Sequence, residues 1–576
     1  MFPRLPDFQQ LFDPQRAGRL LLKELAIPTS AHWRPKHKPL VHERAEDFVV
    51  AEIDSEGMVC EAMRQKAQPS RTHNRMSSFV LTKFRCSTEA ALRLLSKSSG
   101  LKEDKFSISG RKDTFALTSQ RVQVPSPAFS HLKDMCGKWP ELWISGWKEE
   151  AGELWHQGNY FKLNLRWRAG CGIQLHERLQ LQEAISQLTE AGFPNYYGPQ
   201  RFGLMAHVSG RHILRQEYGQ AMRASFSSLA ALSGMRGFHA HSRALEEFLE
   251  GKAASDTQKS VWKLSRGRCL ASKLLNVASR TSDPEAFWVS MPQEGDFAVD
   301  ALSALLWNYM AAFRLEHYGW SAVQGDLVRQ TTASGTHLRV IGPGEAHAFR
   351  LADVYLPRLF CKNNGNTTGP AEREPELILG QPMCSSRPLF PALPALEQYV
   401  QSLLASWGLG GLPEATECAS RASKATAWCD FYRPRVGFPF RSVICLPTKL
   451  GVTFCPEDFP SNFERLNLFI PSKHRNCPHA IAGLPSAARS VKQLECSRVD
   501  FCAENEAAAK VQLNFVLPVG AFATCLTQTL AGWDTGRKTT AKTIVGNVCF
   551  CRECDLVAHF REKCAGRDIT HLVCTA

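Results

Sequence analysis

The sequence predicts a protein of mixed α and β structure in at least two domains, one of them inserted into the other. The chain has 576 residues, more than one ordinary hydrophobic core accommodates. Its hydrophobic content of 44% and charged content of 22% are typical of a folded, soluble protein. A strong late strand pattern at 511–524 has no sequence neighbour with which to complete a core. We therefore expect it to return to the sheet of the first domain.

The individual elements follow from hydrophobic periodicity. Alternation of apolar and polar residues predicts a strand, and an apolar stripe at every third or fourth residue predicts a helix. In the predicted strand 42–53, Phe48 and Val50 fall on one face and Val49 on the other. Further strands are expected at 79–84, 155–168, 325–330 and 337–342. Helices are expected from Thr88 as N-cap to Gly100, over much of 212–319 with an end at Gly319, and at 396–408.

The segment 106–124 predicts a strand, a tight loop and a second strand, with Asp113 at the tip. Gly110 permits a sharp turn between the two alternating runs. Arg111 and Lys112 precede the aspartate, and their charges favour an ionised carboxylate, a nucleophile or anion and not a proton donor. The same pattern also fits a charged hairpin turn in water. Local spacing alone does not decide between the two.

The charge balance favours a polyanionic partner. There are 69 Lys and Arg against 55 Asp and Glu, which gives a net charge of +14 and a pI near 9.0. A nucleic-acid surface also requires these charges to gather on one face, which a sequence does not show.

A loop at 195–203, with the sequence NYYGPQRFG, is rich in groups that bind RNA. Aromatic rings stack on bases, amides reach base edges, and a guanidinium binds phosphate. A tyrosine-rich turn held against the core is the alternative. The side chains in this loop that we expect to contact RNA are Asn195, Gln200, Arg201 and Phe202.

Cysteine usage and the termini indicate the compartment. Twenty cysteines without regular spacing, and without a secretory signal, favour a reducing environment over a disulfide framework. No apolar run approaches the roughly 18 residues of a membrane span, so we expect no membrane association. The basic residues of the first forty fit an organelle-targeting segment, whereas their acidic neighbours argue against one. We expect an intracellular protein of the nucleus or cytoplasm, with the mitochondrion as the alternative.

The C-terminal tail contains enough soft ligands for a zinc ion. Its Cys and His residues include one Cys-x-x-Cys pair, but the second pair that would make a zinc site specific is missing. Reduced, partly buried thiols are the alternative, and we predict no metal. The residues concerned are Cys549, Cys551, Cys554, His559, Cys564, His571 and Cys574.

Several separated motifs, taken together, resemble the TruD family of pseudouridine synthases. Each motif alone is weak, but their joint order along the chain, from about residue 40 to residue 530, is specific. The matching segments are EDFVVAE at 46–52, GRKDTFALTSQ at 110–120, GNYF at 158–161, NYYGPQRFG at 195–203 and LPVGAFAT at 517–524.

The resemblance implies an α+β fold, in which a pseudouridine-synthase catalytic domain with a mixed, largely antiparallel sheet is interrupted by a TruD-type α/β insertion domain. It implies isomerisation of a uridine in RNA, most readily tRNA, to pseudouridine, without a cofactor. By motif position, Asp113 matches the catalytic aspartate, Asn159 and Phe161 line the active site, and Phe48 matches the aromatic of the first motif. Arg111 and Lys112 are then expected either to hold the carboxylate ionised or to bind phosphate.

We expect a monomer with four segments. Residues 1–39 form an N-terminal extension, 40–190 the first part of the catalytic domain, 191–450 the insertion domain, and 451–576 the return to the catalytic domain with a divergent tail.

The chain departs from the family pattern in four places. His42 stands where the family has Lys, Ser109 replaces Ala, Ala521 replaces Ser, and an acidic residue is missing near 527–530. Residues 455–505 match no motif. These departures motivate an alternative function, a catalytically weak RNA-binding scaffold or chaperone in tRNA or ribosome maturation. A zinc-dependent nucleic-acid binder is a third reading.

Overall fold

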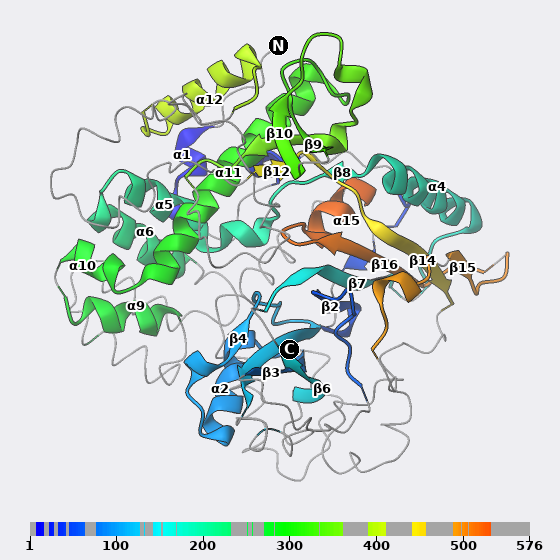
Figure 1. The fold of residues 1–576 in the computed structure, drawn as a ribbon, viewed down its shortest axis with the longest axis horizontal. Coiled ribbons are helices and arrows are strands. Elements are labelled where there is room, and N and C mark those ends of the chain that lie inside the picture. The colour runs from blue at the N-terminus through cyan, green and yellow to red at the C-terminus, as the bar shows by residue number, and fades with distance from the viewer. Residues whose placement is uncertain are drawn as a thin grey trace.

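The structure is a computed structural model of the chain (Figure 1). Its long described stretches are 45–63, 76–126, 142–150, 154–168, 170–231, 270–281, 283–332, 335–360, 390–410, 440–456, 488–496, 498–504 and 506–531. Shorter described pieces are 7–16, 22–27, 33–37 and 39–41, with the single residues 132, 250 and 256.

A ten-stranded sheet dominates the described part of the chain. Its main path runs in the order β15-β14-β16-β7-β2-β5-β3-β6, and the short β1 and β4 pair with β7 and β5. All pairs are antiparallel except β2 with β5 and β14 with β15. The mixed, largely antiparallel sheet expected from the sequence is therefore confirmed. The strands are β1 (Leu40–Val41), β2 (Phe48–Asp54), β3 (Met76–Phe84), β4 (Ser107–Ile108), β5 (Leu117–Pro125), β6 (Leu142–Glu150), β7 (His156–Arg166), β14 (Thr448–Cys455), β15 (Arg498–Asp500) and β16 (Lys510–Pro518).

The late strand β16 returns to the first sheet, as predicted. It pairs with β7 without interruption from Lys510 opposite Arg166 to Pro518 opposite Gly158. The sheet thus joins residues that are some 350 positions apart in the chain. Whether the domain limits lie at 39, 190 and 450 stays a prediction.

The residues between β7 and β14 form helices and two small sheets. One sheet contains β10 (Gly335–Val340), β9 (Leu327–Thr332), β11 (Val354–Pro357) and β12 (Phe440–Ser442) in that order, and β8 (Phe193–Pro194) pairs with β13 (Ile444–Cys445). The helices are α4 (Leu175–Ala191), α5 (Ala206–Leu214), α6 (Tyr218–Ala231), α9 (Leu270–Ala278), α10 (Pro284–Val289), α11 (Pro292–Tyr318) and α12 (Pro394–Ser406).

The 27-residue helix α11 forms the centre of this second group. It ends where the sequence predicts, because Gly319 follows it in the left-handed region with φ of 78°. Near that end Arg314 and Asp326 form a fully buried ion pair of 2.6 Å. Asn308 donates to the carbonyl oxygens of Leu25 and Tyr197, both at 3.0 Å. The helix therefore anchors both the N-terminal segment and the NYYG loop.

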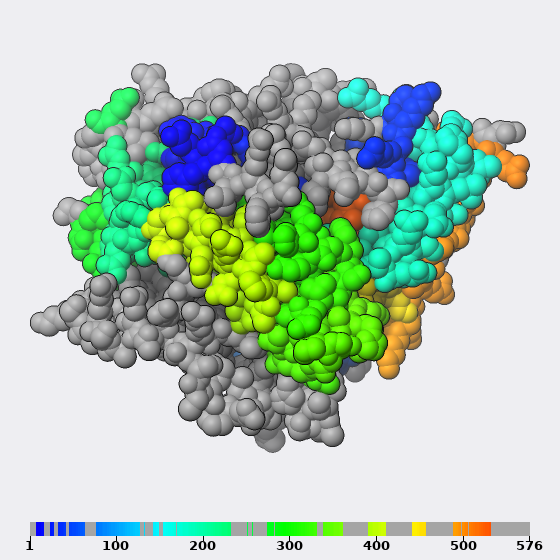
Figure 2. Space-filling model, turned by 90° about the horizontal axis from the view of Figure 1, so that it is seen from above, coloured from blue at the N-terminus to red at the C-terminus, as the bar shows by residue number. Residues whose placement is uncertain are grey.

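The N-terminal segment lies against the helices. The helix α1 (Phe8–Leu11) lies beside α12 on the surface (Figure 2), and the ring of Phe12 meets that of Trp407 edge-on at 5.3 Å. Further along, Leu25, Ile27 and Trp33 are at most 2% exposed. As far as it is described, the segment belongs to the apolar core.

One face of the large sheet carries two apolar clusters with polar side chains between them. The first cluster surrounds β7, β16, α4 and α15 (Ala523–Ala531), and the second surrounds β3, β5 and α2 (Thr88–Ser99). Residues that pair across strands share a face of the sheet. By register, the polar side chains that lie on this face between the clusters are Glu52, Lys83, Thr118, Gln120 and Asn159. A polar strip on an otherwise apolar face is where a reactive site is expected.

Candidate active site

The loop that carries Asp113 joins β4 to β5 over this polar strip. Ser107 pairs with Gln123 and Ile108 with Val122, which confirms the predicted hairpin. The connection is longer than a tight turn, because β4 ends at Ile108 and β5 begins at Leu117. Asp113 lies partly buried in the middle of it.

Lys83 lies beneath the loop and binds its backbone. The side chain is fully buried near the end of β3. Its Nζ donates to the carbonyl oxygens of Asp113 at 2.6 Å, Cys86 at 2.8 Å and Lys112 at 3.2 Å. Burial lowers the pKa of this ammonium to about 8, although Cys86 and Asp113 act to raise it. Three acceptors for three N–H donors hold the loop at the aspartate itself.

Two further side chains hold the start of the loop. Gln120 Nε2 donates to the carbonyl oxygen of Gly110 at 2.9 Å, and the backbone N–H of Lys112 donates to Thr88 Oγ1 at 3.1 Å. The N-cap of α2 is Ser87, whose Oγ accepts a backbone N–H of the first turn at 3.0 Å. The prediction of Thr88 as the N-cap is therefore wrong by one residue, and its hydroxyl serves the loop instead.

The two cations before Asp113 are paired with other acids. Lys112 Nζ lies 2.8 Å from Glu52 Oε1, in a pair whose side chains are 7% and 0% exposed. Arg111 Nε lies 2.8 Å from Glu89 Oε1, yet its side chain is 66% exposed. Of the two, only Arg111 is accessible to an RNA phosphate. The expected RNA contact of Lys112 conflicts with its burial, because its charge already meets that of Glu52 inside the protein.

The Asp113 carboxylate makes no hydrogen bond or ion pair with any residue that the structure describes. Its negative charge partly opposes the lowering of the Lys83 pKa by burial. His42, the first departure from the family pattern, lies outside the described residues. The backbone of Asp113 is thus held by the protein while its carboxylate oxygens stay open to a reactant.

An aromatic cluster lies on the same face of the sheet as the polar strip. Phe161 on β7 lies between Phe48 on β2 and Phe515 on β16, with ring centroids 5.9 Å and 5.2 Å apart. Two residues earlier, Asn159 has a buried Oδ1 with no hydrogen-bond partner among the described residues. Gly158 is required beside it, because a Cβ there would lie 2.3 Å from a carbonyl oxygen of β16.

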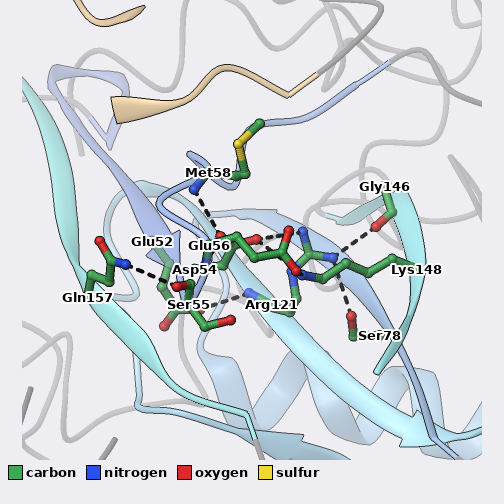
Figure 3. A network of polar contacts seen from close by, with 10 residues as sticks. All are labelled: Glu52, Asp54, Ser55, Glu56, Met58, Ser78, Arg121, Gly146, Lys148 and Gln157. Carbon is green, nitrogen blue, oxygen red and sulfur yellow. Dashed lines mark hydrogen bonds and ion pairs between the residues drawn. The ribbon is translucent and has the colours of Figure 1, made fainter. Parts of the chain in front are cut away.

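A network behind the loop fixes the end of β2. The Asp54 carboxylate lies 3.3 Å from Arg121 Nη2 and 3.5 Å from Lys148 Nζ (Figure 3). The backbone N–H of Arg121 donates to Glu52 Oε2 at 2.9 Å. One oxygen of Glu52 therefore joins β2 to β5, while the other pairs with Lys112 in the loop. Glu52 of the motif at 46–52 therefore contacts Lys112 of the motif at 110–120 and the residue that follows that motif.

The described residues hold no metal-like cluster of three or more His, Cys, Asp or Glu. The eight cysteines whose state is described are free thiols. The Cys-rich tail at 549–574 lies outside the described residues, so the zinc alternative stays untested. Within the described part of the chain, no helix combines the length and the apolar character needed to span a membrane.

The sequence profile of the family described as tRNA pseudouridine synthase D (TruD) matches residues 37–347, just over half of the chain. The chain belongs to the TruD family of pseudouridine synthases. Among its curated relatives, Pseudouridylate synthase 7 homolog of Homo sapiens is 29% identical over 290 residues, or 48% of this chain and 41% of that protein. The Probable tRNA pseudouridine synthase D of Methanococcus maripaludis is 28% identical over 305 residues, or 50% of this chain and 72% of that protein. The matched region thus spans less than half of the mammalian relative.

A solved structure shares the TruD fold. The crystal structure of the putative TruD protein of Methanosarcina mazei aligns with a TM-score of 0.51 at 16% identity, over 89% of this chain and 98% of that one. At this identity the match shows the fold alone. It agrees with the α+β architecture described above.

The NYYG loop of this TruD chain is more buried than the sequence indicates. Asn195 Nδ2 donates to the carbonyl oxygen and the hydroxyl of Ser442 at 3.2 Å, and Phe202 is only 2% exposed. Both side chains are occupied inside the protein, so we do not retain them as RNA contacts. Gln200 and Arg201 are partly buried at the loop's outer side.

Arg441 links this loop to the late LPVGAFAT motif, and the sequence does not signal it. The buried guanidinium lies 4.1 Å from the ring centroid of Tyr197. It donates to the carbonyl oxygens of Asn195 and Gly520, both at 2.8 Å, and to Asn195 Oδ1 at 2.7 Å. Burial lowers its pKa. The sequence does not identify Lys83 as a site residue either. Glu52 and Gln120 lie within the motifs, but the sequence does not show which groups they contact.

Two of the departures leave polar atoms without partners. Ser109 Oγ is buried and makes no hydrogen bond with a described residue. In α15, Gln528 is 1% exposed, and neither its amide oxygen nor its amide nitrogen has a partner among the described residues. Ala521 packs at the edge of the larger apolar cluster.

Proposed function

We propose that the chain isomerises a uridine in RNA to pseudouridine, with Asp113 as the nucleophile. One observation carries this proposal. The Asp113 carboxylate has no partner among the described residues, while Lys83, Thr88 and Gln120 bind its loop at four backbone atoms. An open carboxylate on a rigidly held backbone is what a nucleophile requires, because a misplaced group loses most of its rate advantage.

The bond changes balance without a redox partner. The carboxylate attacks the ribose at C1′, or stabilises the positive charge there, as the C1′–N1 bond breaks and its electron pair leaves on uracil N1. The uracil then turns and bonds to C1′ through C5. The C5 proton is lost, N1 takes up a proton, and the carboxylate is regenerated.

The aromatic cluster and Asn159 support retention of the free uracil during its rotation. Phe48, Phe161 and Phe515 supply an apolar wall beside the strip, which favours a dry pocket over an open one. The unpartnered Asn159 Oδ1 is an acceptor for a uracil N–H or a ribose hydroxyl. Such a bond would remove the cost of leaving that oxygen buried and unsatisfied.

The RNA contacts that the geometry supports are Arg111, Gln200 and Arg201. Arg111 is exposed two residues before Asp113, and its pairing with the partly exposed Glu89 is weak enough to yield to a phosphate. The family description names tRNA, and we propose tRNA as the first substrate to test. A target base inside structured RNA has to be extruded, which costs a few kcal/mol and is offset by such contacts.

Asp113→Asn tests the proposal. We expect release of tritium from [5-³H]uridine-labelled, unfractionated tRNA to fall below detection, while the Kd for that tRNA stays within about twofold of the wild-type value. Asp104→Asn is the matched control, because Asp104 is an exposed aspartate of the same segment. Substantial turnover by Asp113→Asn would contradict the role of nucleophile.

The alternative function is an RNA-binding scaffold or chaperone with little chemistry, motivated by His42 and Ala521. The same assay separates the two. A wild-type protein that binds tRNA but releases no tritium from tRNA or from total RNA would support the scaffold. Mapping pseudouridine across cellular RNA after depletion of the protein identifies the substrate.

A further inference from the structure

Phe297 is an exposed aromatic ring on α11, on the helix face that contacts the Asp113 loop through Gln293. Its side chain is 40% exposed. It shares one helix face with Gln293 and Asp300, which lie four residues before it and three after it. Each of these two neighbours meets an arginine from another segment, since Arg111 Nη2 lies 3.5 Å from Gln293 Oε1 and Arg201 Nη2 lies 3.1 Å from Asp300 Oδ2.

The ring is therefore placed between two cations. The Arg201 guanidinium lies 5.9 Å from the centroid of Phe297 and 5.8 Å from that of Tyr197. Its Nε is buried without a hydrogen-bond acceptor among the described residues. The ion pair of Arg201 with the partly exposed Asp300 is of the kind that yields to a phosphate. A guanidinium next to an open aromatic face matches the chemistry of a nucleotide, which offers a phosphate and a π-face together.

Phe297 is linked to the Asp113 loop through the contact of Arg111 with Gln293, one helical turn away from the ring. Arg111 is two residues from Asp113, so their Cα atoms are at most about 7 Å apart. Phe297 is one helical turn, about 6 Å, from the Arg111 contact at Gln293. When a uridine is extruded toward Asp113, an adjacent base loses its stacking partner and requires another surface.

A single exposed apolar side chain needs no special explanation. Trp320, just beyond the other end of α11, is 62% exposed and illustrates this. Phe297 differs from it because two arginines from family motifs flank the ring, one of them from the loop of Asp113.

We propose that Phe297 is a stacking platform for an RNA base next to the target uridine, with Arg111 and Arg201 binding the phosphates on either side of that base. This subsite rests on the proposed RNA-modifying function and names where its substrate is held.

The test measures binding, independently of catalysis. The probe is a fluorescein-labelled, single-stranded RNA of 12 nucleotides with one central uridine, at one fixed salt concentration. We expect Phe297→Ala to raise its Kd about tenfold, within the roughly 5- to 150-fold range that stacking supports, and Phe297→Trp to retain wild-type Kd. Trp320→Ala is the matched control and should leave the Kd unchanged. Because Phe297 is exposed, the thermal midpoint of Phe297→Ala should equal that of the wild type.

Abasic probes identify the stacked base. Each probe of the series carries one abasic sugar, either directly before or directly after the uridine. At one of these two positions the abasic sugar should raise the Kd of the wild-type protein as much as Phe297→Ala does. At that position the abasic sugar should not raise the Kd of the Phe297→Ala variant any further. A Kd for Phe297→Ala within twofold of wild type, or no position that couples, overturns the platform. Tritium release by the wild-type protein reports on the proposed function separately, so the two failures are distinguishable.

Discussion

Lys83 is the single residue on which the geometry of the candidate site depends most. It lies at the end of a strand whose other inward residues, Phe79 and Leu81, are apolar. The titratable groups that face it are Cys86, Asp113, Glu89 and Lys112, in order of effect after burial. Removing its ammonium group would leave three carbonyl oxygens without this donor, two in the Asp113 loop and one at Cys86, which costs more than the loss of the bonds themselves.

Lys83→Met should therefore lower kcat for tritium release by about 100-fold, with a smaller effect on KM for tRNA, because the aspartate is misplaced and the RNA surface is not. Lys83→Arg, which keeps the charge and the donors, should recover part of the rate. Lys97→Met, at an exposed lysine of α2, is the control. Wild-type kcat in Lys83→Met would show that the loop does not depend on this anchor.

The same residue predicts a pH dependence. Burial lowers the pKa of Lys83 to about 8. Below that value the ammonium offers three N–H donors to three carbonyl oxygens, and above it the amine offers only two. If the chain has the proposed activity, the kcat of the wild-type protein should thus decline as the pH rises through 8. The kcat of Lys83→Met should not show this decline at alkaline pH. An unchanged decline in the variant would show that another group causes it.

At the scale of elements, the site depends on how β2 meets the Asp113 loop. Glu52 on β2 is completely buried, and its carboxylate holds both Lys112 of the loop and the backbone of β5. His156 lies 3.7 Å from the same carboxylate, and burial lowers its pKa to about 4, so it is neutral at pH 7. His156 therefore adds no positive charge beside this carboxylate, and Lys112 is its cationic side-chain partner.

Glu52→Gln should destabilise the protein by about 3 kcal/mol, since it leaves the buried Lys112 without its counter-charge. The double variant Glu52→Gln with Lys112→Met should lose less free energy of unfolding than the two single variants lose in sum, because no unpaired charge remains. Urea denaturation followed by tryptophan fluorescence measures both. Glu103→Gln, in the exposed pair with Arg93, is the matched control and should cost under about 1 kcal/mol. Strictly additive losses would show that the pair is not coupled.

At the scale of the whole molecule, the N-terminal segment joins parts of the chain that are far apart. Trp33 donates its backbone N–H to the carbonyl oxygen of Leu530 at 2.8 Å and its indole N–H to the carbonyl oxygen of Glu177 at 3.1 Å. Tyr309 donates to the carbonyl oxygen of Glu24 at 2.6 Å. His207 binds the carbonyl oxygen of Leu11 at 2.9 Å. These contacts connect the segment to α4, α5, α11 and α15, and they argue that it contributes to the fold.

His207 makes this contact sensitive to acid. Burial lowers its pKa to about 4, against an ordinary value near 6.5. Between these values the unfolded chain binds a proton that the folded chain excludes, so stability should fall as the pH decreases from 6.5 to 4. His156 contributes in the same window and direction. His207→Gln should reduce the dependence of the melting temperature on pH between 4 and 6.5. His347→Gln, at an exposed histidine, should leave this dependence unchanged. Equal slopes in the two variants would remove His207 as a cause.

The sequence by itself predicts those features that depend on neighbours along the chain. Alternation places Phe161 and Leu163 on one face of β7, and a stripe closed by Gly319 identifies α11. The pairing of the two strands around Asp113 follows from the alternation that flanks the loop. The sharp turn expected at Gly110 is absent, because the loop is longer and Gly110 does not adopt a positive φ. The order of the motifs indicates the family and the candidate nucleophile, because the residues of each motif are contiguous in the sequence. Such signals are local, and a local pattern survives in a linear sequence.

Only the tertiary structure decided which of these residues touch. The burial of Asn195 and Phe202 depends on Ser442 and His207, and the pairing of Lys112 with Glu52 crosses 60 positions of the chain. Lys83 looks like one polar residue in an apolar strand until the loop folds over it. Arg111 meets Gln293, which shares a helix face with Phe297, across 182 positions of the chain. These contacts arise from strand register and helix orientation, which are set by the packing of the whole core, and no short stretch of sequence contains that information.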